Sequence, residues 1–182
     1  DAFEPCDVRT EVIAVKGGDP VKIDVLEGLR GPLVGDAFDG TEGLGRRFGL
    51  SMSATWLAPR PYTGLLRSHT LRSPVAFHDL FRDGSTSSVG AVYADAAGHI
   101  AYRCGVEAPV RKEGFGTMPR PGWGEGEGWG GLVPFEDMPA TTDPSAGFVV
   151  AANQAPAPDA SGPYLGADFL DGYRATRIAT EI

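Results

Sequence analysis

The sequence predicts an α+β chain with an antiparallel sheet, a few short helices and long loops. Several stretches alternate apolar and polar residues, as half-buried strands do, and turns rich in Gly, Asp and Pro separate them. Only a few short stretches repeat apolar residues at helical spacing. The 182 residues suit one large domain or one and a half small ones, and the 26 Gly and 15 Pro indicate a loop-rich chain. The hydrophobic content of 42% is enough for a packed core and argues against disorder.

The first part of the chain is expected to be a β meander over residues 8–34. Residues 8–15 partly alternate, and residues 21–27 alternate cleanly between apolar and polar side chains. Between them, Lys16-Gly17-Gly18-Asp19-Pro20 suits a hairpin turn, because glycine accepts positive φ and proline stops pairing. A short third strand is expected at 30–34.

The next part is expected to contain a loop, a strand and a short helix. Residues 35–46 are rich in Gly and Asp and predict a loop. Residues 47–56 alternate again and predict a strand. Leucines at roughly helical spacing predict a short helix over 62–72.

A second helix is predicted to begin at Ser73-Pro74. A hydroxyl at the cap position followed by Pro at the first helical position is a typical helix start. The apolar stripe of this helix should consist of Phe77, Leu80 and Phe81. His78 lies off the stripe and is expected at the rim or exposed.

A second hairpin is predicted over residues 88–105. Its turn, Asp95-Ala96-Ala97-Gly98, has Asp first and Gly last. His99 follows the turn and is expected to contact solvent.

Residues 106–146 are expected to be mostly loop. The Gly-rich run 122–131 lacks the Lys-Ser/Thr ending of a phosphate loop and is acidic, which would repel phosphate. We interpret it as an irregular segment that Trp123 and Trp129 pin by packing. These two tryptophans and Trp56 are expected in the core rather than in contact with substrate.

The apolar run 147–152 predicts a buried strand that ends in two side-chain amides, Asn153 and Gln154. Downstream, residues 168–178 predict a helix that carries two arginines. An amide held at a strand end can donate a hydrogen bond to a developing oxyanion. Amides also commonly tie loops together, so the local residues leave both interpretations open.

Charge and composition argue against several kinds of site. The net charge is −8 and the arginines are scattered, so the basic stripe of a nucleic-acid groove is missing. No apolar segment approaches the length of a membrane span. Cys6 and Cys104 suit two free thiols or one bridge, but neither a disulfide framework nor a metal knuckle. The histidines lack the spacing of a zinc site.

Short blocks follow one another in a specific order along nearly the whole chain. They are Val15-Lys16-Gly17-Gly18-Asp19-Pro20-Val21, Gly31-Pro32-Leu33-Val34, Tyr93-Ala94-Asp95-Ala96-Ala97-Gly98-His99-Ile100-Ala101-Tyr102, Pro121-Gly122-Trp123, Gly131-Leu132-Val133-Pro134-Phe135-Glu136-Asp137-Met138-Pro139, Gly147-Phe148-Val149-Val150-Ala151-Ala152-Asn153-Gln154 and Gly172-Tyr173-Arg174-Ala175-Thr176-Arg177-Ile178. In this order the blocks resemble the penicillin acylase (penicillin amidase) family.

The resemblance implies part of an N-terminal nucleophile hydrolase, in which two stacked antiparallel sheets lie between helical layers (αββα). A precursor would cut itself into a small and a large subunit. The new N-terminal Ser of the large subunit would attack the amide carbonyl, with its own α-amino group as base. Residues 1–182 would form a single internal segment of the large subunit. Asp1 is not a nucleophile of this kind, and no processing junction of the family is evident.

The implied activity is hydrolysis of a linear amide between an acyl group and an amine. Penicillin, cephalosporin, lipopeptide and homoserine-lactone acylases all fit, and the sequence does not name the acyl group. Lacking the nucleophile, the chain would be inactive alone. The alternative is a non-catalytic β-rich binding or structural module.

Two catalytic roles follow by position from the resemblance. Asn153 matches the oxyanion-hole asparagine, whose side-chain N–H stabilises the tetrahedral intermediate. Arg177 matches the arginine that orients this asparagine and the amino-terminal base, and Arg174, on a neighbouring helical face, is its rival. Gln154 is expected to be a structural amide. The catalytic interpretation predicts that Asn153 and Arg177 meet at an open edge, whereas the alternative predicts a buried Asn153 bonded only to local backbone.

No cofactor is expected for catalysis, but the resemblance implies a structural calcium ion. Asp168 is the best candidate ligand, and the other carboxylates would lie outside this chain. The implied partners are a small-molecule amide substrate, the small subunit and the N-terminal part of the large subunit, with neither nucleic acid nor membrane. The family resemblance implies a periplasmic or secreted bacterial protein, although export stays open because its signal would lie far upstream.

A sheet that lacks neighbouring strands leaves donors and acceptors unpaired. We therefore expect an exposed apolar face or sheet edge, through which the chain can dimerise.

Overall fold

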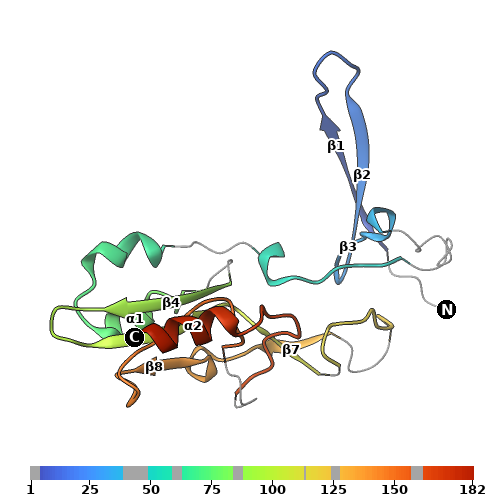
Figure 1. The fold of residues 1–182 in the computed structure, drawn as a ribbon. Coiled ribbons are helices and arrows are strands. Elements are labelled where there is room, and N and C mark those ends of the chain that lie inside the picture. Colours follow the sequence, from blue (N-terminus) through green and yellow to red (C-terminus); the bar gives the residue numbers. More distant parts are fainter. Residues whose placement is uncertain are drawn as a thin grey trace.

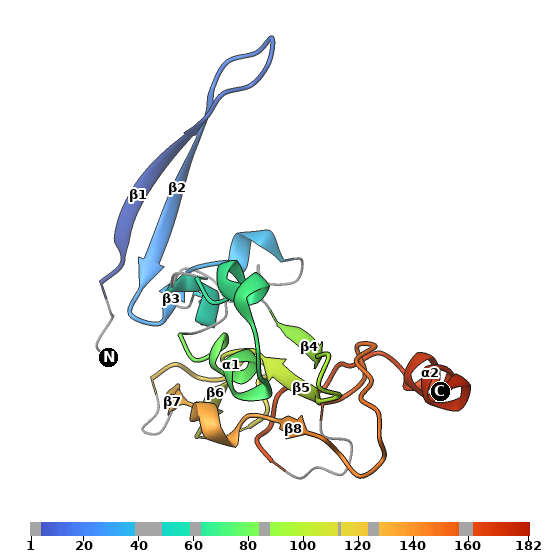
Figure 2. The ribbon, with the colours of Figure 1, turned by 90° about the vertical axis from the view of Figure 1, so that its left-hand side faces the viewer.

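A computed structural model describes residues 5–38, 49–58, 63–83, 88–112, 114–123, 128–156 and 162–182. The predicted α+β class is confirmed, because these residues form antiparallel sheets, short helices and long loops (Figure 1). A long hairpin, residues 7–28, projects away from the rest of the chain and is called the arm (Figures 1 and 2). The remainder is called the body. Within the described ranges, no helix is both long enough and apolar enough to cross a membrane.

The arm confirms the predicted meander. Strands β1 (Asp7–Ile13) and β2 (Val21–Gly28) pair antiparallel along their length, and the short β3 (Gly31–Pro32) pairs with the end of β2. In the turn, Gly17 has a φ of 77°, a left-handed conformation that glycine adopts without strain. Every residue of β1 is exposed.

The strand predicted at 47–56 is wrong within the part that the structure describes. Only Ser51 pairs, in a single antiparallel bridge to Leu33. Its potential neighbour β3 has two residues, which is too short to support a longer ladder. The chain then turns into a short 3₁₀ helix, η3 (Thr55–Leu57).

The helix predicted over 62–72 is a 3₁₀ helix, η4 (Leu65–Thr70). Its two leucines, Leu65 and Leu66, are exposed, so they form no buried stripe. The prediction of a buried apolar stripe is therefore wrong for these two leucines, whereas Leu71, at the C-cap, packs against the core. The helix is held against the body at Gly64, where an added Cβ would lie 1.7 Å from the Leu80 carbonyl oxygen.

Helix α1 (Pro74–Asp79) begins as predicted. Ser73 Oγ accepts a hydrogen bond from the N–H three residues later, at 3.2 Å, and so satisfies a free donor of the first turn. The predicted stripe is buried: Phe77, Leu80 and Phe81. His78 is half-buried rather than fully exposed, and its Nε2 lies 2.9 Å from Thr142 Oγ1.

The body centres on a three-stranded antiparallel sheet in the order β4-β5-β8: β4 (Val89–Ala94), β5 (Ile100–Gly105) and β8 (Ala140–Thr142). The predicted hairpin is therefore confirmed. The stripe of α1 covers one face, where Ala101 is fully buried. On the other face an added Cβ at Gly90 would lie 3.3 Å from the Ala151 Cβ, so the segment around residue 151 covers that face. His99 is exposed, as expected, and its Nδ1 lies 2.8 Å from Asp143 Oδ2.

The prediction that residues 106–146 are mostly loop is partly wrong. The region contains β6 (Pro109–Arg111), β7 (Trp129–Leu132), the 3₁₀ helix η5 (Phe135–Asp137) and β8. Strands of three or four residues are too short to show a clear alternation. The expectation of tryptophans in the core is also wrong, because Trp123 is 75%, Trp56 54% and Trp129 36% exposed.

Candidate functional site

The segment that carries the two amides is a turn and not the predicted strand at 147–152. The Gln154 side chain bridges it, since Oε1 accepts a hydrogen bond from Ala152 N–H at 2.7 Å and Nε2 donates one to Val150 C=O at 2.9 Å. Backbone groups that a ladder would pair are thus bonded to a side chain. The apolar run reflects half-burial over the body sheet, which the pattern alone does not distinguish from pairing. Gln154 is a structural amide, as expected.

Asn153 lies at the outer corner of this turn. Its φ is 64°, in the left-handed region that Asn adopts more readily than most non-glycine residues. Its backbone C=O accepts a hydrogen bond from Leu170 N–H at 3.1 Å, and its side chain is exposed. The preceding Ala152 is buried. The turn therefore anchors its backbone in the body and presents the Asn153 carboxamide outward.

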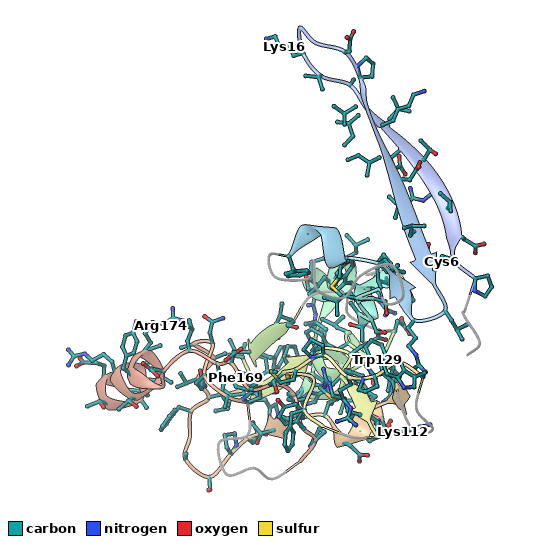
Figure 3. The ribbon with its side chains drawn as sticks, turned by 90° about the vertical axis from the view of Figure 1, so that its right-hand side faces the viewer. Cys6, Lys16, Lys112, Trp129, Phe169 and Arg174 are labelled. Atoms are coloured by element: carbon teal, nitrogen blue, oxygen red, sulfur yellow. The ribbon has the colours of Figure 1, made fainter. Side chains whose placement is uncertain are left out.

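Arg174 holds the Asn153 side chain. Its Nη2 donates to Asn153 Oδ1 at 2.5 Å and to Ala152 C=O at 2.7 Å. A guanidinium has no acceptor, so this contact identifies the oxygen end of the carboxamide and turns its NH₂ group away from the arginine. Arg174 lies on helix α2 (Tyr173–Glu181), on the side of the body away from the arm (Figure 3).

Arg177 forms an ion pair with Glu181 one turn along the helix, at 2.7 Å, and is mostly exposed. The approach to Asn153 that was predicted for Arg177 is thus made by its rival, Arg174. The helix begins at Tyr173, later than the predicted 168. Gly172, at the cap position, has no side chain to signal this start. The first residue of α2 determines which side of the helix faces the turn, and the sequence does not mark that residue. The sequence alone therefore did not decide whether Arg174 or Arg177 contacts Asn153.

A cavity of about 190 Å³ lies beside the turn. Its lining is mostly apolar and includes Phe148, Val150, Tyr102 and Gln154. Burial, with a smaller effect from Cys104, raises the pKa of Tyr102 to about 12. The phenol is therefore neutral at pH 7 and can donate a hydrogen bond but not act as a base.

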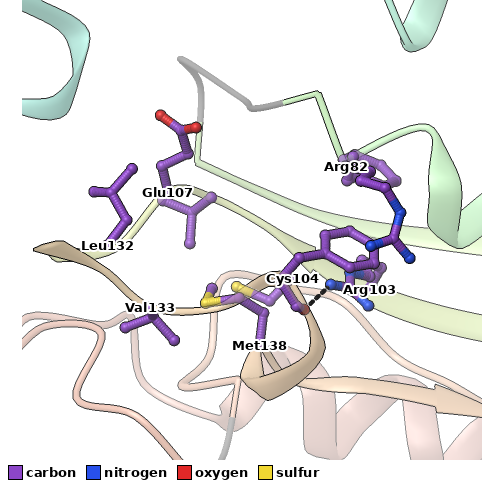
Figure 4. Close-up of a pocket in the computed structure, with 10 residues that line it drawn as sticks. Arg82, Arg103, Cys104, Glu107, Leu132, Val133 and Met138 are labelled. Atoms are coloured by element: carbon purple, nitrogen blue, oxygen red, sulfur yellow. Dashed lines mark hydrogen bonds between the residues drawn. The ribbon is translucent and has the colours of Figure 1, made fainter. Parts of the chain in front are cut away.

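A second cavity, of about 120 Å³, lies elsewhere in the body (Figure 4). The buried Arg103 donates from Nη2 to Phe135 C=O and lies 3.5 Å above the centroid of that ring. Burial raises the pKa of the Cys104 thiol, so it is protonated at neutral pH and a poor nucleophile. Cys104 and the exposed Cys6 are both free thiols, which decides between the two states that the sequence left open. The residues described here pack the body, and the cysteine that lines the cavity is not activated as a nucleophile.

Asp168 is the predicted calcium ligand. This carboxylate is exposed. Within the described ranges, no three or more His, Cys, Asp or Glu side chains gather to hold a metal ion. Because Ca²⁺ also takes backbone carbonyls and water as ligands, the calcium site stays a prediction.

The whole chain, residues 1–182, matches the family model described as penicillin amidase. It is 32% identical over 179 residues to the penicillin acylase 2 proenzyme of Pseudomonas sp. (strain SE83), and 29% identical over 181 residues to the acyl-homoserine lactone acylase QuiP of Pseudomonas fluorescens. Each alignment covers 97% of this chain but 22% of the relative. The chain thus spans less than a quarter of the length of these curated relatives.

The fold is similar to that of a thermostable penicillin G acylase from Alcaligenes faecalis. The TM-score is 0.77 at 22% sequence identity, over 97% of this chain and 32% of that one. The fold is therefore that of one part of a penicillin G acylase.

Proposed function

Because this chain belongs to the penicillin amidase family, we propose that it supplies the oxyanion-stabilising part of an enzyme that hydrolyses linear amides. The observation that supports this role most directly is the Asn153 carboxamide, exposed at the corner of a turn and held through its oxygen by Arg174. The relatives are named as penicillin and acyl-homoserine lactone acylases. The substrate we propose is accordingly an amide that joins an acyl group to an amine.

In the proposed reaction, Asn153 acts on the carbonyl oxygen of the substrate. A nucleophile from the remaining part of the enzyme, the N-terminal Ser that the family resemblance implies, attacks the carbonyl carbon, and the oxygen becomes negatively charged. The Asn153 NH₂ group donates a hydrogen bond to this oxygen. Because Arg174 fixes the oxygen end of the carboxamide, the NH₂ group is held in position before the charge develops.

Asn153→Ala in the full-length protein tests the proposal. Removing one oxyanion donor typically lowers kcat by about 10²–10³-fold, and we expect a loss of this size with little change in KM. The melting temperature should fall modestly, because Ala adopts the φ of 64° at this position less readily than Asn. Lys112→Ala, at an exposed position on the body, is the control and should leave turnover unchanged. Full turnover in Asn153→Ala would refute the role.

The orienting arginine is tested by a pair of variants on α2. We propose Arg174 for this role because of its contact with Asn153, whereas the family resemblance points to Arg177. Arg174→Ala should lower kcat at least tenfold, and Arg177→Ala should cost little because it removes only an exposed ion pair with Glu181. The reverse order of effects would assign the role to Arg177.

A non-catalytic module is the less well supported alternative. It predicts an Asn153 that is buried and bonded only to local backbone. Asn153 is instead exposed and bonded to a side chain 21 positions away in the sequence.

A further inference from the structure

The second cavity of the body contains a buried arginine with an unsatisfied donor. Arg103, on β5, is 5% exposed and lines this cavity of about 120 Å³ (Figure 4). Its Nη2 donates to Phe135 C=O, but its buried Nε–H has no hydrogen-bond partner among the described residues. Buried donors without a partner are rare in native proteins, and they indicate a group from outside the chain, such as a water molecule or a ligand.

The positive charge of Arg103 also lacks a counter-charge. Among the described residues, no carboxylate forms an ion pair with it, because Asp79 and Glu136 pair with Arg82 instead, at 3.2 and 2.7 Å. Glu107 lines the cavity too, but its carboxylate points away from the Arg103 guanidinium (Figure 4). A buried charge without a partner is costly, so the site favours an anion.

A second guanidinium strengthens the positive charge of the cavity. Arg82 is part of the lining, and the Cζ atoms of Arg82 and Arg103 lie 4.1 and 3.5 Å from the centroid of the same ring, that of Phe135. Burial, and next the charge of Arg82, lower the pKa of Arg103, whereas Glu136 acts in the opposite direction. A guanidinium nevertheless stays protonated in a protein, so the two positive charges repel each other. A bound anion would offset this repulsion.

The far wall of the cavity is apolar. Leu132, Val133 and Met138 contribute to it, and Figure 4 shows Leu132 and Val133 on the side away from Arg103. The cavity volume of about 120 Å³ is well above the roughly 30 Å³ that one water molecule occupies in the liquid. A ligand that suits both ends therefore has a negative charge at one end and a short hydrocarbon chain at the other.

We propose that this cavity binds a small aliphatic carboxylate, which accepts a hydrogen bond from Arg103 Nε and lays its hydrocarbon chain against Leu132 and Val133. Hydrogen bonds between a guanidinium and a carboxylate are charge-assisted and strong. Water would satisfy the N–H but leave the charge unpaired, and phosphate would leave the apolar wall without contact. The site is independent of the proposed role of Asn153, which lies outside this lining.

Isothermal titration calorimetry of the full-length protein with butyrate tests the proposal. We expect one butyrate to bind per chain. Butylammonium has the same hydrocarbon chain with the opposite charge and should not bind. Inorganic phosphate has the negative charge without the hydrocarbon chain and should bind at least tenfold more weakly than butyrate.

Three variants locate the ligand. Arg103→Met removes the charge but keeps an unbranched side chain, and it should weaken butyrate binding at least tenfold. Arg67→Met is the matched control, because Arg67 is an exposed arginine that pairs with Asp83 at 3.4 Å, and its butyrate affinity should equal that of the wild type. Leu132→Trp fills the apolar end and keeps the charge. It should also weaken binding at least tenfold, which provides an independent test if Arg103→Met fails to fold.

Each other outcome overturns the proposal. Equal butyrate binding by the wild type and Arg103→Met places the ligand elsewhere, and loss of binding in Asn153→Ala places it at the proposed catalytic site. Phosphate that binds as tightly as butyrate means that the apolar wall takes no part. A wild-type protein that neither binds butyrate nor gains melting temperature in its presence has a cavity that water alone fills or that the rest of the enzyme closes.

Discussion

The chain contains two antiparallel hairpins that lie in very different surroundings. The hairpin of β4 and β5 has α1 packed on one face, the segment around Ala151 on the other, and β8 paired with its edge. The hairpin of β1 and β2 has exposed apolar side chains on both faces and a free edge in the described chain. Both arise from alternating sequence joined by a tight turn.

The difference separates what local sequence determines from what long-range partners determine. Alternation and turn residues are enough to pair two neighbouring strands. Burial depends on elements that are distant in sequence, such as β8, which joins the body hairpin from residues 140–142. The body hairpin finds these elements within the described chain, and the arm does not.

The largest expected stability difference follows from this contrast. Phe77→Ala removes a buried ring that packs on the body sheet, and should lower the free energy of unfolding by about 3–5 kcal/mol. Val12→Ala in the 182-residue chain removes an exposed side chain and should change it by no more than about 0.5 kcal/mol. Urea unfolding measures both. A large effect of Val12→Ala in this chain would mean that the arm is already covered.

A smaller loss of stability is expected from a change next to the segment around Ala151, which covers the second face of the body hairpin. Gln154→Ala removes two hydrogen bonds that hold the turn next to this cover, and leaves partly buried backbone groups at Ala152 and Val150 without them. We expect a loss of about 1–3 kcal/mol in the free energy of unfolding. The loss should be the same at low and high protein concentration, because the contacts lie within one chain. An unchanged free energy of unfolding would show that the two Gln154 hydrogen bonds are not needed to hold the covering segment in place.

The two hairpins, α1 and its cap were predictable from sequence because their signals lie within a few neighbouring residues. Strands β6, β7 and β8 were not, since each has three or four residues and pairs with a distant partner. The run 147–152 looked like a strand because half-burial on a sheet face produces the same apolar pattern as pairing.

The candidate site was predictable only in part. Asn153 could be singled out by the order of blocks along the chain, and its exposed position at a held turn fits that choice. Its arginine partner could not, because the start of α2 at Gly172 lacks a capping side chain. The tryptophans were misassigned because large apolar side chains are expected inside, although folded surfaces also contain many apolar atoms.

The helix that covers the body hairpin depends on its cap. Ser73→Ala removes the side-chain acceptor of the first turn of α1 and should cost about 1 kcal/mol. Ser73→Asp keeps an acceptor and should restore most of the stability. Thermal unfolding distinguishes the two variants, and equal losses would mean that the cap contributes through something other than its hydrogen bond.

The smallest expected effect on stability comes from a charged pair at the turn of the body hairpin. At the body turn, a hydrogen bond to Asp143 and the charges of Asp143 and Asp95 raise the pKa of His99 above 6.5. Hydrogen bonds from Ile100 N–H and from His99 lower the pKa of Asp143. Since the folded-state pKa of His99 is raised, its contribution to stability is fully present below pH 6.5 and is lost as the pH rises through the raised value.

Titration of the His99 ring by NMR checks this pair. Asp143→Asn should move the pKa of His99 back toward 6.5, because it removes the charge that lies 2.8 Å from Nδ1. Asp19→Asn in the arm turn is the matched control and should leave this titration unchanged. If Asp143→Asn also leaves it unchanged, the ion pair does not persist in solution, and the turn is held without it, in part by the hydrogen bonds that Asp95 Oδ1 accepts from the Ala97 and His99 N–H groups.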